Sequence, residues 1–223
     1  VVVATDPALL DAVAAIGGAA VMAAPIRVGV RGDGAVYYTN PEYWARAYLR
    51  GSYDRADAAV QKTAARLAGA FGPGKPAGGD IKTEDLANYR YMLGMERFGD
   101  RSELAEFASF EQAVQTVRDN LAKGVGETAQ VYAIVLPEKK VAVFGVALNS
   151  AEYGEGWWVN KIGAYNFAAL PWEIYVVEGL DSLLELPVGS FALLTKIHHA
   201  AVDAEGGVWT AGLLGYFLDF NKP

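Results

Sequence analysis

The most apolar run near the N-terminus, residues 12–26, limits what the start of this chain can form. Gly17, Gly18 and Pro25 interrupt the run, whereas a helix that spans a bilayer needs about 20 predominantly apolar residues. No basic segment precedes it, so the run also lacks the pattern of a secretory signal peptide. We therefore expect a buried helix followed by a strand.

Short helices and strands are predicted along the rest of the first 165 residues. Asp6 and Pro7 have the positions of an N-cap and a first helical residue, and residues 31–34 (RGDG) are typical of a turn between two strands. Residues 72–80, rich in glycine and proline, predict a loop or linker. The pattern further indicates helices at 40–51, 55–71, 83–99 and 109–124, and strands at 129–136 and 141–148.

Composition and charge exclude several classes of site. The 223 residues are 52% hydrophobic, which is enough for a substantial core. The net charge is −7, and lysine and arginine are scattered singly, which argues against a nucleic-acid surface. The absence of cysteine excludes disulfides, thiolate metal sites and a cysteine nucleophile. It suits the cytosol and the exterior alike, and the lack of a spanning segment slightly favours the cytoplasm.

Three other motifs have simpler explanations than a binding site. The RGDG sequence could indicate a cell-adhesion motif, but a turn between strands accounts for its glycines. The glycine-rich stretches 72–79 and 124–130 lack the spacing of a phosphate-binding loop. The aromatic cluster at residues 153–158 could stack on a sugar or line an apolar pocket, although such residues more often pack in the core or anchor a loop.

The C-terminal stretch has a pattern that is typical of a catalytic site. Residues 171–180 and 189–197 have the length and composition of strands, and residues 208–220 have helical length and periodicity. Between the second strand and this helix lie His198 and His199, the chain's two histidines. A strand end that leads into a loop commonly carries catalytic groups. Adjacent residues of an extended chain point to opposite faces, so only one imidazole can face a given cavity.

Three interpretations of the histidine segment follow from its residues. A neutral imidazole can accept a proton from an attacking hydroxyl, and Asp203 can hold the loop or a ring nitrogen. Alternatively, both histidines satisfy buried backbone groups and Asp203 caps the following helix. A metal site formed by His199, Asp203 and Glu205 is a third reading, disfavoured because adjacent histidines diverge.

The segments PWEIYVVEGL and GSFALLTKIHHAAVDAEGG, with their spacing, resemble the bacterial wax ester synthase/acyl-CoA:diacylglycerol acyltransferase family, whose signature is H-H-x-x-x-D-G. The resemblance covers about residues 171–210, and Ala204 replaces the signature glycine. Positions outside the signature that match the family's pattern are Trp172, Glu173, Tyr175, Glu178, Gly179, Phe191, Lys196 and Ala200.

The resemblance implies a fold and a mechanism. The fold would be like that of chloramphenicol acetyltransferase, with acyl-CoA entering one side of a tunnel and an alcohol the other. His199 would be the general base, and His198 and Asp203 would have mainly architectural roles. The acceptor would be an alcohol or diacylglycerol, acyl-CoA would be a co-substrate with no further cofactor, and peripheral lipid contact would be expected.

We therefore expect an α+β protein with mixed sheets and helices. Residues 1–165 would form an α+β domain, with a candidate linker at 72–80. Residues 166–223 would form an acyltransferase-motif segment, similar to one half of a CoA-dependent acyltransferase. The first residue is Val1 rather than Met, which suits a trimmed, fragmentary or recombined chain. The alternative function is a non-catalytic α+β binding or structural domain, in which the histidine segment is structural.

Overall fold

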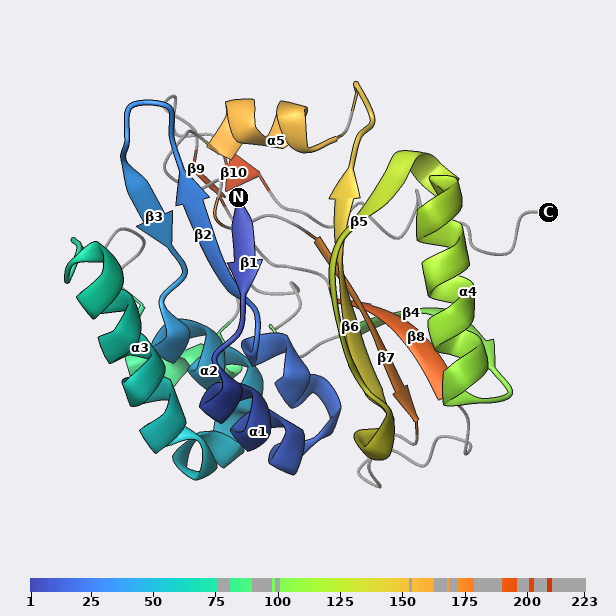
Figure 1. The fold of residues 1–223 in the computed structure, drawn as a ribbon, viewed down its shortest axis with the longest axis horizontal. Coiled ribbons are helices and arrows are strands. Elements are labelled where there is room, and N and C mark those ends of the chain that lie inside the picture. The colour runs from blue at the N-terminus through green and yellow to red at the C-terminus, as the bar shows by residue number, and fades with distance from the viewer. Residues whose placement is uncertain are drawn as a thin grey trace. The chain divides into compact units, whose positions relative to one another are not determined.

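The chain forms two compact units in the computed structural model, Val1–Gly99 and Asp100–Pro223, whose elements are drawn in Figure 1. Each unit is described by itself. The structure describes residues 1–75, 81–89, 98, 101–152, 154–162, 168, 172–178, 190–195, 201–202 and 208–209.

The first unit combines a small antiparallel sheet with three α-helices in the part of the chain that is described. The sheet has the order β1-β2-β3. Its strands are β1 (Val2–Ala4), β2 (Ile26–Val30) and β3 (Val36–Tyr38). The helices are α1 (Pro7–Ile16), α2 (Pro41–Leu49) and α3 (Asp57–Phe71), with 3₁₀ segments at Gly18–Ala23, Arg50–Arg55 and Thr83–Asn88.

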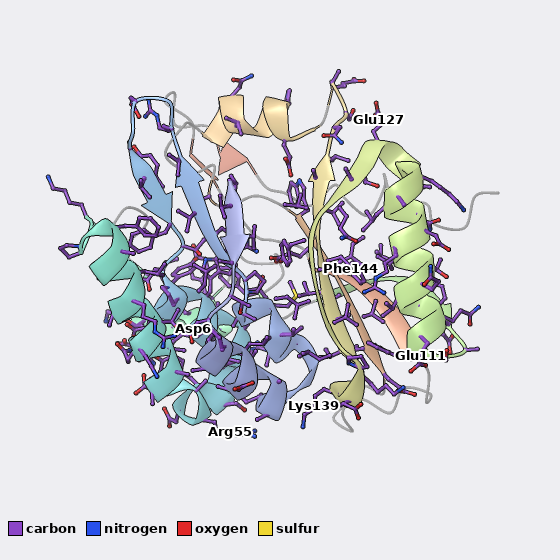
Figure 2. The ribbon with its side chains drawn as sticks, viewed as in Figure 1. Asp6, Arg55, Glu111, Glu127, Lys139 and Phe144 are labelled. Carbon is purple, nitrogen blue, oxygen red and sulfur yellow. The ribbon has the colours of Figure 1, made fainter. Side chains whose placement is uncertain are left out.

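Local chemistry explains where α1 begins and how it is held. The carboxylate of Asp6 accepts hydrogen bonds from the backbone N–H groups of Ala8 and Leu9, at 2.9 and 3.3 Å, which satisfies two orphan donors of the first turn. Asp6 also forms an ion pair with Arg66 of α3. Burial opposes ionisation of Asp6, but the bonds from Arg66, Leu9 and Ala8 outweigh it and lower the pKa of this carboxyl. Figure 2 labels Asp6 beside α1.

An aromatic cluster fills the core beside α2. Trp44 and Tyr48 stack at a centroid distance of 5.7 Å, and Phe98 meets Trp44 edge-on at 6.2 Å. The guanidinium of Arg27, fully buried, lies 4.7 Å from the centre of the Trp44 ring. This contact gives the buried cation of β2 a favourable electrostatic partner.

The second unit is built on an antiparallel sheet covered by a helix. Helix α4 (Phe110–Lys123) contacts all five strands of the sheet and lies along it in Figure 1. Its buried face is formed by Phe110, Ala113, Val114, Val117 and Leu121. Among the described residues, the sheet has the order β4-β8-β7-β6-β5. The strands are β4 (Arg101–Phe107), β5 (Thr128–Leu136), β6 (Val141–Leu148), β7 (Trp172–Glu178) and β8 (Ser190–Thr195).

Smaller elements of this unit include 3₁₀ segments at Val125–Glu127 and Pro137–Lys139. Helix α5 (Glu155–Ile162) follows the turn after β6. The two-residue strands β9 (Ala201–Val202) and β10 (Val208–Trp209) pair with each other, and β9 contacts α5. None of the helices in the described residues combines the length and apolarity needed to cross a bilayer.

The α+β class expected from the sequence is confirmed, and each described strand pair is antiparallel. The hairpin around residues 31–34 is present. The two units divide at 99–100, and residues 163–167, around the expected boundary of 165–166, lie outside the described residues. Hydrogen bonds join five strands into one sheet, in which β7 and β8 lie between β4 and β6. The candidate linker at 72–80 is described only as far as residue 75.

Two predicted helices differ from the structure where it is described. Residues 83–88 form a 3₁₀ segment, closed by bonds such as that from Asp85 N–H to the Lys82 carbonyl at 3.0 Å. The helix expected at 208–220 begins instead as β10, because Val208 pairs with Val202 of β9. A tertiary partner thus overrides the local helical period. Residues 90–97 and 210–223 lie outside the described residues.

Candidate functional site

Three strands of the five-stranded sheet begin or end at the same end of the sheet. Val146 lies opposite Trp172, and Ile174 lies opposite Leu194. Because neighbouring strands are antiparallel, β6 ends, β7 begins and β8 ends at this same end of the sheet. The sequence after β8 leads to the histidine pair, since β8 ends at Thr195.

The three site residues predicted from the sequence, His198, His199 and Asp203, lie outside the described residues. The residues of the alternative metal site, including Glu205, also lie outside them. Strand β9, which separates His199 from Asp203 in the sequence, is described and contacts α5. Within the described residues, no group of three histidine, cysteine, aspartate or glutamate side chains could hold a metal ion.

Three residues on neighbouring strands lie opposite one another near this end of the sheet. Tyr132 of β5 lies opposite Gly145 of β6, and Gly145 lies opposite Glu173 of β7. The hydroxyl of Tyr132 donates a hydrogen bond to Oε1 of Glu173, whose side chain is fully buried. A Cβ atom at Gly145 would overlap the Tyr132 ring. The glycine therefore lets the tyrosine cross β6 and reach the buried carboxyl group.

A pocket of about 550 Å³ lies where β6 leads into α5. Its wall combines the end of the strand, the turn that follows and the first two turns of the helix. The described residues that line it are Leu148, Asn149, Ser150, Ala151, Glu155, Gly156, Trp157 and Asn160. The wall therefore offers two amides, a hydroxyl, a carboxyl and an indole, a donor and acceptor set suited to a small polar ligand.

Close backbone packing fixes the turn that forms one wall of the pocket. The N–H of Gly154 donates to the Ser150 carbonyl at 2.8 Å, and the N–H of Trp157 donates to the Gly154 carbonyl at 3.1 Å. A Cβ atom at Gly154 would overlap the carbonyl oxygens of Leu148 and Ser150. Only glycine fits this position without movement of the backbone.

Glu155 has the most perturbed carboxyl group of the described residues in this unit. Burial raises its pKa to about 7, against an opposing hydrogen bond from the backbone of Leu148. Its Oε1 atom is buried and has no hydrogen-bond partner in the described part of the chain. A carboxyl with this pKa is present in both protonation states near neutral pH and can either donate or accept a hydrogen bond.

The sequence pointed to Glu173 only through the resemblance, and it did not indicate the Tyr132 partner, Gly145 or Glu155. One signal was available: a glycine inside the apolar strand VAVFGVAL often marks a close approach. The contact with Tyr132 depends on strand register, and the burial of Glu155 depends on packing. Neither is encoded in local spacing.

Comparison with known proteins gives one finding. A family model described as the wax ester synthase/diacylglycerol acyltransferase catalytic domain matches residues 170–220. The resemblance of the C-terminal segment is thereby confirmed. The match contains β7, β8 and the whole histidine segment, which is therefore similar to part of an acyltransferase catalytic domain. The chain matches no curated protein and no solved structure.

The matched segment and the pocket occupy different parts of the second unit. Residues 170–220 supply the central strands β7 and β8 of the sheet. The pocket residues, from Leu148 to Asn160, precede the match. The wax ester synthase/diacylglycerol acyltransferase resemblance therefore gives no account of the pocket.

Proposed function

We propose that the protein is an O-acyltransferase that moves a fatty acyl group from acyl-CoA to an alcohol or diacylglycerol. The observation that carries this proposal is the family match over residues 170–220, which includes His198, His199 and Asp203. No metal or prosthetic group is needed for this reaction. Lipid substrates imply peripheral contact with a lipid surface.

His199 is the proposed general base. Its neutral imidazole takes the proton of the acceptor hydroxyl while the hydroxyl oxygen bonds to the carbonyl carbon of the thioester. The tetrahedral adduct then expels the CoA thiolate as the C–S bond breaks, and the imidazolium returns the proton to sulfur. The products are an ester and free CoA.

His198 and Asp203 are proposed to hold the segment that presents His199. Neighbouring residues of an extended chain face opposite sides, so His198 would pack while His199 meets the substrates. Asp203 would fix the loop or a ring nitrogen. Ala204 stands where the signature has glycine. If a left-handed backbone is required there, alanine costs on the order of 1 kcal/mol.

The sheet supports this proposal by offering a firm base for the segment. β7 is buried on both faces up to Val177 and hydrogen-bonds to β6 and β8, and β8 ends three residues before His198. A catalytic loop keeps its backbone position well when the strand before it is paired inside a sheet, as β8 is with β4 and β7.

The decisive experiment measures CoA release from palmitoyl-CoA, with hexadecanol or dioleoylglycerol as acceptor. The chain has no cysteine, so a thiol reagent detects only the released CoA. We expect turnover with at least one acceptor, and His199→Ala should lower it by about 10²- to 10⁴-fold.

Lys139→Ala is the matched control, because this side chain is exposed on the turn between β5 and β6 (Figure 2). It should retain the parent rate. If the folded parent and His199→Ala release CoA equally, or neither releases it, the acyltransferase proposal fails. The alternative is then a non-catalytic α+β binding or structural domain.

A further inference from the structure

The pocket after β6 has the features of a binding site in its own right. None of its described lining residues is lysine, arginine or histidine, so no described side chain of this wall would balance the charge of a phosphate or carboxylate ligand. Its polar side chains are those of Asn149, Ser150, Glu155 and Asn160. The amide and hydroxyl groups among them both donate and accept hydrogen bonds, as sugar hydroxyls do.

Glu155 supplies the strongest reason to expect an occupant. A buried oxygen without a hydrogen-bond partner is rare in folded proteins and calls for an explanation, and Oε1 of Glu155 is such an atom within the described residues. The terminal torsion of a glutamate is soft, so a modest rotation brings a carboxyl oxygen toward a ligand in the pocket.

Size and wall chemistry narrow the ligand class. The volume of about 550 Å³ lies within the range of small-molecule sites, about 300–1,000 Å³. Trp157 and Leu148 add apolar surface beside the polar groups, which suits a molecule with hydroxyls at its rim and C–H groups on its faces. An ammonium ligand would find one carboxyl that is partly protonated at neutral pH rather than a fixed anion.

We infer that this pocket binds a small, neutral, hydroxyl-rich ligand of the size and class of a monosaccharide. Asn149, Ser150, Glu155 and Asn160 hydrogen-bond its hydroxyls, and Trp157 contacts its apolar face. The inference is independent of the proposed acyltransferase activity, because no lining residue of the pocket lies in the matched segment 170–220.

The test uses the full chain and four probes: D-glucose, D-galactose, D-mannose and ethanolamine. Saturation-transfer difference NMR detects binding, and titration gives the dissociation constant. We expect at least one sugar to bind and ethanolamine not to bind. Glu155→Ala and Asn160→Ala should each weaken sugar binding about 3- to 10-fold, which corresponds to the loss of one or two hydrogen bonds.

Controls separate binding from folding. Asn160 is exposed on α5, so its replacement by alanine should leave the far-UV spectrum and melting temperature unchanged. Glu152→Ala removes an exposed carboxylate of the same turn that does not line the pocket, and it should bind sugar as the parent does. Equal saturation transfer in all variants, binding of ethanolamine alone, or no binding by any sugar would overturn the inference.

Discussion

At the scale of single residues, two glycines and two carboxyl groups shape the second unit. Gly145 makes room for Tyr132 to reach Glu173, and Gly154 lets the turn after β6 close on itself. Each glycine acts through the absence of a Cβ atom. Of the two carboxyls, Glu173 is fully buried and Glu155 is half-buried.

Gly145→Ala should destabilise the protein by about 1–3 kcal/mol, the usual cost of forcing an extra methyl group into a packed site. The methyl group would meet the Tyr132 ring and disturb its hydrogen bond to Glu173. Urea unfolding checks this expectation. Gly156→Ala is the matched control. Gly156 lies in α5, and a Cβ atom at this position meets nothing within 4 Å. A Tyr132→Ala background should remove most of the Gly145→Ala cost.

Glu155→Gln should raise stability at pH 8 and leave it nearly unchanged at pH 4. The folded pKa of about 7 exceeds the ordinary value of 4.5, so between these values the folded state binds more protons than the unfolded state. Stability from this group is therefore present below about pH 4.5 and is lost as pH rises through 7. We expect a gain on the order of 1 kcal/mol, discounted for partial exposure. Thermal unfolding at both pH values measures it, and equal gains would contradict the assignment.

At the scale of elements, α4 shows how a local signal and a tertiary surface act together. Ser109 accepts a hydrogen bond from Gln112 N–H at 3.1 Å, and Gln112 Oε1 accepts one from Ala108 N–H at 3.2 Å. Two side-chain acceptors, those of Ser109 and Gln112, therefore satisfy backbone N–H groups at the start of the helix. Its apolar face, which begins at Phe110, is buried in the second unit, where α4 contacts all five sheet strands.

Ser109→Ala should lower the free energy of unfolding by about 0.5–2 kcal/mol, because the Gln112 N–H loses its acceptor. Chemical denaturation of the second unit, followed by tryptophan fluorescence, measures the change. Arg118→Ala, at an exposed position in the middle of α4, serves as the comparison and should stay within about 0.5 kcal/mol of the parent. An equal loss in both variants would argue against the cap.

At the scale of the whole molecule, the second unit depends on strands that are far apart in the sequence. β4 pairs with β8, and β7 completes the link from β8 to β6. β4, β5 and β6 thus form only part of a sheet, and β7 and β8 lie between β4 and β6. The matched acyltransferase segment is, in the described structure, integral to the sheet.

A chain truncated after residue 165 should retain the first unit and lose the second. Removal of β7 and β8 leaves β4 without its partner, exposes one edge of β6 and uncovers part of the apolar face of α4. Amide hydrogen exchange of the truncated and full chains tests this expectation. Persistent protection of β5, β6 and α4 in the shorter chain would show that 1–165 folds alone.

The sequence by itself determined most local elements and one family resemblance. Capping residues at Asp6, Asn40 and Ser109 set helix starts, and the strand runs 141–148 and 171–180 contain β6 and β7. These signals work because a cap or an alternating run acts through near neighbours in the chain. The histidine segment was recognisable for the same reason, since its residues are contiguous.

Only the tertiary structure decided how these elements combine. It placed β7 and β8 between β4 and β6, set Tyr132 against Glu173 across Gly145, and left Glu155 half-buried beside a polar pocket. It also turned residues 208–209 into a strand through pairing with β9. Such contacts join residues that are distant in the sequence, so their energies depend on the register and packing of the finished fold.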